Sequence, residues 1–102
     1  PRSTLFPYTT LFRSKTELKN ASGLHARPAS EFVAMAKQFE SKVTVQRLDD
    51  EAALPANAKS IIKILAQGLA VGTPIEIAAD GPDEVEAVEK LFELVESKFG
   101  ED

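Results

Sequence analysis

The stretch Gly23-Leu24-His25-Ala26-Arg27-Pro28-Ala29 marks the point where a turn passes into an amphipathic helix. Asn20-Ala21-Ser22 precede it, and Asn, Ser and Gly favour turns through local side-chain hydrogen bonds or a positive φ. Pro28 falls in the first helical turn, where its missing N–H costs nothing. We therefore predict a helix over residues 26–39, with His25, the only histidine of the chain, directly before it.

Apolar periodicity places the other elements around this helix. The predicted helix carries one apolar stripe at helical spacing. Strands are predicted at 12–19, 42–48 and 74–79, and a weak strand at 52–56 lies at a sheet edge because Pro55 cannot donate to a ladder. Further helices are predicted at 61–67 and 82–98. The stripe of the first helix is Ala29, Phe32, Val33, Ala36 and Phe39.

The resulting order β-α-β-β-α-β-α predicts an α+β fold whose helices cover one face of a small sheet. A hairpin tip at 49–51 makes the strands on either side of it antiparallel neighbours. Asp80 is the predicted N-cap of the last helix, followed by an early proline and acidic residues. The predicted buried stripe of that helix is Val85, Val88, Leu91, Phe92, Val95 and Phe99.

Composition narrows the class of protein. A chain of 102 residues with 43% apolar content forms one domain with one core. No apolar run approaches the ~20 residues of a membrane span. The net charge of −4 argues against nucleic acid as a partner. The absence of cysteine fits a reducing compartment, and we expect a cytoplasmic protein.

The charge is unevenly distributed along the chain. Residues 80–102 carry a net charge of −7 and residues 1–79 a net charge of +3, so His25 lies in the basic part.

Residues 1–14 differ from the rest of the chain. Residues 4–14 resemble the in-frame translation of a common short-read sequencing adapter, so we interpret 1–14 as non-native and 15–102 as the domain. The alternative is a genuine extension with two β-prone runs. In either case, residues 12–18 have enough β character to form a strand.

A phosphoryl-accepting site would use the residue types around His25. Imidazole is nucleophilic near neutral pH. The N-terminus of a helix offers N–H donors, here from Ala26 and Arg27, and the Arg27 guanidinium can pair with phosphoryl oxygens. The residues alone leave open a histidine that merely caps the helix or fills a surface position. A metal site lacks ligands, and no Gly-x-Ser-x-Gly elbow is present.

Gly-Leu-His-Ala-Arg-Pro-Ala resembles the active-site motif of the HPr family, the histidine-containing phosphocarriers of the bacterial phosphoenolpyruvate:sugar phosphotransferase system. The resemblance extends from about Lys15 to the C-terminus. It implies an open-faced sandwich with sheet order 1-4-2-3, phosphorylation of His25 on Nδ1, and assistance from Arg27. It also implies a monomeric, stoichiometric carrier without a cofactor, placed between enzyme I and EIIA proteins.

The stretch from Asn57 to Ile64 is similar to the second motif of this family, in which a serine is phosphorylated by a dedicated kinase. Ser60 suits the N-cap of a helix, and a phosphate there would lie beside Lys59. The resemblance implies HPr kinase/phosphorylase and a transcriptional regulator as further partners. The alternative is a plain N-cap serine.

The second motif also contains the apolar and basic residues of the family's docking patch. By this resemblance, Ile61, Ile62 and Leu65, with Lys59 and Lys63, would face partners, whereas a purely structural interpretation buries the apolar ones. Two departures stand out: residues 47–57 form a longer segment than usual, and Gln67 replaces an apolar residue. The chain ending resembles the nitrogen-related paralogue, so a phosphorylation-dependent regulatory binding module stays open as an alternative.

Overall fold

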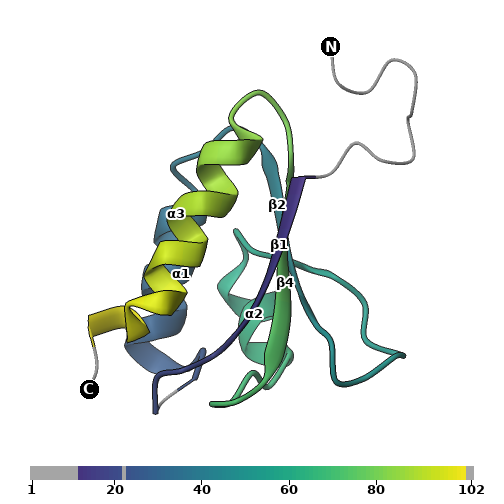
Figure 1. Ribbon diagram of the computed structural model, residues 1–102, viewed down its shortest axis with the longest axis vertical. Coiled ribbons are helices and arrows are strands. Elements are labelled where there is room, and N and C mark those ends of the chain that lie inside the picture. Colours follow the sequence, from purple (N-terminus) through teal and green to yellow (C-terminus); the bar gives the residue numbers. More distant parts are fainter. Residues whose placement is uncertain (1–11, 22, 101–102) are drawn as a thin grey trace.

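Four antiparallel strands form one sheet in the order β1-β4-β2-β3, as predicted (Figure 1). The computed structural model describes residues 12–21 and 23–100. The elements, in chain order, are β1 (Phe12–Glu17), α1 (Ala26–Ala36), β2 (Lys42–Arg47), β3 (Ala56–Asn57), α2 (Ile61–Ala66), β4 (Pro74–Asp80), α3 (Glu84–Glu96) and a 3₁₀ turn (Lys98–Gly100).

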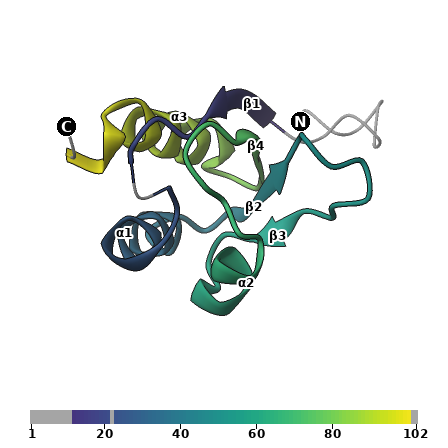
Figure 2. The same cartoon turned by 90° about the horizontal axis from the view of Figure 1, so that it is seen from below.

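The central strand β4 pairs along its length with both β1 and β2, while β1 and the two-residue β3 lie at the edges. The three α-helices cover one face of the sheet and leave the other face open (Figure 2). This arrangement is the predicted open-faced sandwich. Its four strands and three α-helices follow the order expected from the apolar periodicity.

The core lies between the sheet and the helix layer. The predicted stripe of the first helix is buried in full, with Phe32 and Ala36 completely inaccessible and Phe39 the most exposed member at 9%. The sheet contributes alternate residues, because side chains along a strand point to opposite faces. Those core residues are Val43 and Val45 of β2 and Ile75, Ile77 and Ala79 of β4.

Most predicted boundaries differ from the observed ones by one or two residues, and two differ by more. Helix α1 ends at Ala36 rather than residue 39, and Phe39 follows in a turn whose N–H donates to the Ala36 carbonyl. The third strand is Ala56–Asn57, not 52–56. Leu48 still donates its N–H to the Pro74 carbonyl of β4 at 2.8 Å. Beyond it, the Ala52 and Ala53 N–H groups bond to Asp50, and the Ala53 and Leu54 carbonyls accept side-chain amides.

The start of α3 also differs from the prediction. Asp80 ends β4, and the N-cap is Asp83. The Asp83 carboxylate does not cap the helix: it accepts hydrogen bonds from the N–H groups of Glu40 and Ser41, each at 2.9 Å, and from the Ser41 hydroxyl. These bonds fasten the corner between α1 and β2 to α3.

The buried stripe of α3 is shifted by this start. Val85 is 46% exposed, so its predicted place in the core was wrong. In the first turn, the buried residues are Glu84 and Ala87. The Glu84 carboxylate accepts a hydrogen bond from the Gly81 N–H at 3.0 Å. Val88, Leu91, Val95 and Phe99 are buried as predicted, and Phe92 is half-buried.

The boundary predicted at residue 14 falls inside a strand. Phe12 to Ser14 form the first half of β1 and pair with Ala79, Ala78 and Ile77. The rest of the segment interpreted as non-native, residues 1–11, lies outside the described part of the chain. The origin of 1–14 therefore stays a prediction.

The turn before α1 is in backbone contact with the chain that follows α2. The Leu24 N–H donates to the Leu69 carbonyl at 2.8 Å. Gly23 has φ +62°, and a Cβ atom there would lie 2.4 Å from the Leu69 oxygen and 2.8 Å from the Ala70 Cα. Only glycine fits, because both the backbone conformation and the missing space exclude a side chain.

We expect Gly23→Ala to lower the free energy of unfolding by well over the ~1 kcal/mol that a positive φ alone costs. Gly72→Ala is the matched control, since Gly72 has φ +86° but no atom within 4 Å of its Cβ position. Urea denaturation of both variants separates the clash from the strain. Equal losses would contradict the role assigned to the contact with residues 69–70.

The hydrogen bonds to Asp83 predict an acid sensitivity. Chiefly the Ser41 hydroxyl, and then the Glu40 N–H, lower the pKa of Asp83. A carboxyl whose pKa is depressed by folding stabilises the protein above its unfolded pKa of about 3.9, and this contribution is lost as the pH falls through the folded pKa. We expect Asp83→Asn to lower the melting temperature at pH 7, with a difference from wild type that shrinks below about pH 4. Glu86→Gln, on the same helix, is the control.

Candidate functional site

His25 is the N-cap residue of α1 and its side chain is exposed. Its backbone is extended, with φ −130° and ψ 160°, and its carbonyl accepts the Ala29 N–H at 3.5 Å. The imidazole makes no capping hydrogen bond to the helix, so the side chain does not act as a cap, and the alternative of a histidine that fills a surface position stays open. The ring stands in solvent at the positive end of a helix of 11 residues.

The backbone around His25 is held on both sides. Leu24 is fully buried, and Pro28 and Ala29 pack inward one turn later. Ala26 and Arg27 occupy the first two helical positions, so their N–H groups have no i−4 carbonyl within α1. An anion on the imidazole would therefore meet helix N–H groups and the positive end of the helix dipole.

The Arg27 guanidinium bridges the start of α1 and the C-terminal turn. Its Nη1 pairs with the Glu31 carboxylate one helical turn along, and its Nη2 donates to the Phe99 carbonyl at 3.0 Å. Lys98 and Phe99 have φ +60° and +54°, a left-handed conformation that is rare outside glycine. The predicted phosphate-binding arginine is thus positioned by two partners that the local motif does not contain.

Ser60 is the N-cap of α2, as predicted from sequence. Its backbone is extended, and its Oγ accepts the Lys63 N–H at 3.3 Å. Lys59 does not approach this hydroxyl: its ammonium donates to the Phe39 carbonyl at 2.7 Å. The capping role of Ser60 is confirmed, and Lys59 contributes to the packing of α2 against the end of α1.

Helix α2 buries one large apolar residue and exposes three. Ile64 is inaccessible, whereas Ile61 is 37%, Leu65 43% and Ile62 74% exposed. Lys63, in the same helix, is also exposed. The interpretation that all the apolar residues of this helix belong to the core was therefore wrong. Exposure of three large apolar side chains on a six-residue helix is typical of a contact surface.

This exposed surface continues onto α1. A shallow groove of about 270 Å³ lies between the two helices and is bordered by Ile61 from α2 and by Val33 and Lys37 from α1. Lys37 is exposed. The groove thus joins Ile61 of α2 to the helix that follows His25.

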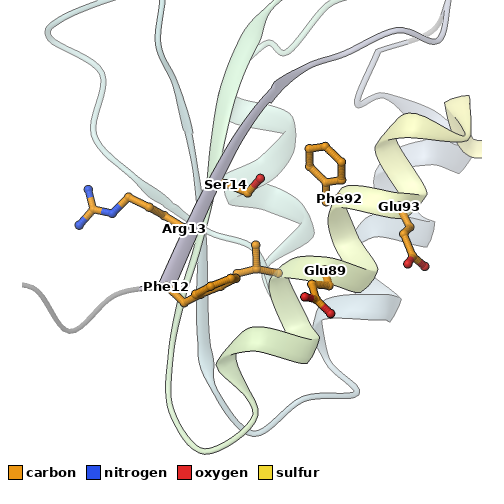
Figure 3. A pocket seen from close by; sticks show the side chains of 7 residues that line it. Phe12, Arg13, Ser14, Glu89, Phe92 and Glu93 are labelled. Carbon is orange, nitrogen blue, oxygen red and sulfur yellow. The ribbon is translucent and has the colours of Figure 1, made fainter. Parts of the chain in front are cut away.

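A second hollow, of about 610 Å³, lies between β1 and α3 (Figure 3). The rings of Phe12 and Phe92 border it, together with the carboxylates of Glu89 and Glu93. Phe12 belongs to the segment predicted to be non-native. None of the predicted site residues lines this hollow.

Within residues 12–21 and 23–100, no three His, Cys, Asp or Glu side chains gather in a way that could hold a metal ion. No helix in this part of the chain is long and apolar enough to cross a membrane.

Comparison with known proteins agrees with the geometry. Residues 12–97 match the family model described as the PTS HPr component phosphorylation site. The chain is 38% identical over 91 residues to the phosphocarrier protein HPr of Neisseria meningitidis, covering 89% of this chain and 98% of that protein. It is also 38% identical over 94 residues to the multiphosphoryl transfer protein of Vibrio cholerae, covering 92% of this chain but only 22% of that much longer protein.

A solved structure gives the same result. The crystal structure of HPr-C-His from Thermoanaerobacter tengcongensis superposes with a TM-score of 0.82 at 42% identity, covering 89% of this chain and 98% of that one. The sheet order, the exposed histidine at the start of α1 and these similarities agree with one another. The chain belongs to the HPr family of phosphocarriers of the phosphotransferase system.

Proposed function

We propose that the chain carries a phosphoryl group on His25, which it receives from phosphorylated enzyme I and passes to EIIA proteins. The observation that carries this proposal is the exposed imidazole at the N-terminus of α1, which makes no capping hydrogen bond, in a chain of the HPr family. The protein acts as a stoichiometric carrier. Transfer from enzyme I phosphorylates His25, and transfer to an EIIA protein returns the same histidine to its free form.

The transfer needs a neutral imidazole as nucleophile. The lone pair of Nδ1 attacks the phosphorus of the donor, the N–P bond forms, and the bond between phosphorus and the donor breaks. The N–H groups at the start of α1 and the Arg27 guanidinium offset the charge on the phosphoryl oxygens. The Arg27 guanidinium is bonded to the Glu31 carboxylate and to the Phe99 carbonyl. To bind the phosphoryl group, it would exchange one of these partners for a phosphoryl oxygen.

The exposed residues of α2 supply the surface for these protein partners. Ile61, Ile62 and Leu65 offer apolar contact area, and Lys63 adds a positive charge beside them. Such a surface favours a partner with apolar side chains bordered by carboxylates. Lys59, already bonded to the Phe39 carbonyl, contributes through the position of α2 rather than as a mobile charge.

We expect His25→Ala to abolish uptake of ³²P from phosphoenolpyruvate in the presence of enzyme I, because no other side chain of the chain is an imidazole. Gln38→Ala, an exposed change near the far end of α1, is the matched control and should be labelled like the wild type. Labelling that persists in the His25 variant would exclude the proposed carrier function.

Ser60 is proposed as a regulatory phosphorylation site, which HPr kinase/phosphorylase would modify and a transcriptional regulator would read. A phosphate there would add about two negative charges to the start of α2, close in sequence to Lys63. Binding of an acidic partner to this surface would then be weakened by like-charge repulsion. Local support comes from the half-exposed position of Ser60 at the helix start.

Two substitutions separate the regulatory role of Ser60 from its capping role. Ser60→Ala removes the cap and should lower the free energy of unfolding by about 1 kcal/mol. The KM of enzyme I for the chain should stay unchanged. Ser60→Asp keeps a capping side chain and adds a charge, and should raise that KM several-fold. Steady-state phosphotransfer and urea denaturation provide the two readouts. A wild-type KM for Ser60→Asp would argue against control by charge at this position.

A further inference from the structure

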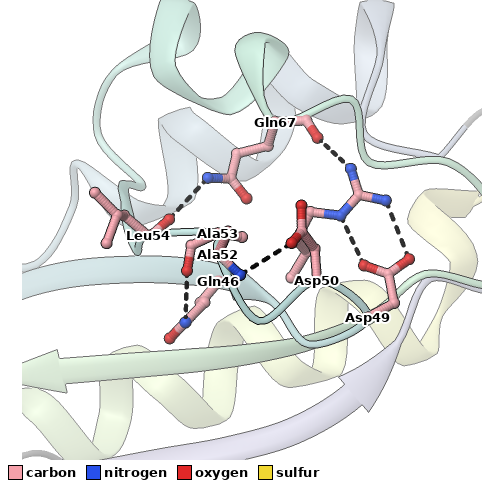
Figure 4. A network of polar contacts seen from close by, with 8 residues as sticks. Gln46, Asp49, Asp50, Ala52, Ala53, Leu54 and Gln67 are labelled. Atoms are coloured by element: carbon pink, nitrogen blue, oxygen red, sulfur yellow. Dashed lines mark hydrogen bonds and ion pairs between the residues drawn. The ribbon is translucent and has the colours of Figure 1, made fainter.

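The segment between β2 and β3 is fastened to the C-terminal end of α2 (Figure 4). The Gln67 side-chain amide donates to the Leu54 carbonyl at 3.0 Å. Arg47, at the end of β2, donates through Nη1 to the Gln67 carbonyl at 2.8 Å. Two hydrogen bonds therefore join the segment and its supporting strand to the residue that ends the helix.

Residues 48–55 have further hydrogen bonds of their own. The Gln46 amide donates to the Ala53 carbonyl at 3.0 Å, and the Ala52 N–H donates to the Asp50 carboxylate at 2.9 Å (Figure 4). The Arg47 guanidinium also holds Asp49 at both carboxylate oxygens, at 2.7 and 3.0 Å. The segment therefore has a defined conformation, fixed by side chains at its base.

This arrangement places Leu54 at the same end of the molecule as His25. Gln67 lies two residues before Leu69, whose carbonyl accepts the N–H of Leu24, the neighbour of His25. In Figure 1 the start of α1, the end of α2 and the tip of the 48–55 segment all lie at the lower end of the molecule. Two hydrogen bonds, joined by the backbone of residues 67–69, thus connect the loop to the turn that presents the imidazole.

Leu54 is the most exposed large apolar residue of the described chain, at 76%, followed by Ile62 of α2 at 74%. The Leu54 carbonyl accepts the Gln67 amide, so the loop brings a further exposed apolar residue to the C-terminal end of α2. The positive charge comes from Lys63 of α2, whereas the loop itself is acidic: Arg47 pairs with Asp49, and Asp50 and Glu51 are exposed.

We propose that Leu54 is a specificity-determining docking residue, held by Gln67 and Arg47 so that it contacts the protein that phosphorylates His25. This inference rests on the proposed phosphocarrier function. The partner it fits is a protein that presents an apolar side chain to Leu54 and carboxylates to the basic residues of α1 and α2. The loop thereby makes the docking surface of this chain larger than α2 alone provides.

The test measures phosphotransfer from enzyme I, phosphorylated with phosphoenolpyruvate, to the full chain and to three variants. Leu54→Ala should raise the KM for the chain about 5-fold with kcat within twofold, because an apolar contact is lost while the chemistry is untouched. Gln67→Ala should raise it by a smaller factor, since it releases the loop without removing Leu54. Val85→Ala, an exposed apolar change on α3, is the matched control and should leave KM unchanged.

The outcomes distinguish this inference from the function on which it rests. If the wild type is labelled on His25 and Leu54→Ala keeps the wild-type KM, the docking role is overturned and the carrier function stands. If the wild type is not labelled at all, both fail. Circular dichroism of each variant provides the folding check, and Leu54→Asp, which cannot create a cavity at so exposed a position, should raise the KM at least as much as Leu54→Ala.

Discussion

The contact between the Gly23 turn and the chain after α2 is the constraint on which the site depends. It joins two segments that are more than 40 residues apart, through the Leu24–Leu69 hydrogen bond and a backbone approach that leaves no space for a side chain. The start of α1 is thereby fixed against the end of α2. The imidazole of His25 consequently has a fixed place relative to the end of α2, to which the Gln67–Leu54 bond fastens the 48–55 segment.

Local sequence patterns were sufficient to predict most of the fold. The stripe from Ala29 to Phe39 gave the buried face of α1, and period-two alternation gave β2 and β4, because both patterns report burial against a single core. The errors lie where contacts distant in sequence decide the structure. Asp80 belongs to β4, and the carboxylate of Asp83 binds Glu40 and Ser41 instead of capping the helix. The Ala53 and Leu54 carbonyls accept side-chain amides, and β3 begins only at Ala56.

The site was predictable to the same extent. The place of His25 before a helix and the capping role of Ser60 follow from adjacent residues, and three exposed apolar side chains on α2 follow from a helix too short to bury them. The Arg27–Phe99 and Lys59–Phe39 bonds could not be predicted, since no local pattern links these residues. For the Gln67–Leu54 bond one signal did exist, a polar residue at the end of an apolar helix.

The central claim is that the molecule presents one imidazole as its phosphoryl acceptor. Its most direct test is to phosphorylate the chain with phosphoenolpyruvate and enzyme I and to map the phosphate by ³¹P and imidazole ¹⁵N NMR. We predict a single acid-labile phosphate bonded to Nδ1 of His25. A phosphate on Ser60 or another oxygen, or a chain that stays unmodified, would contradict the claim.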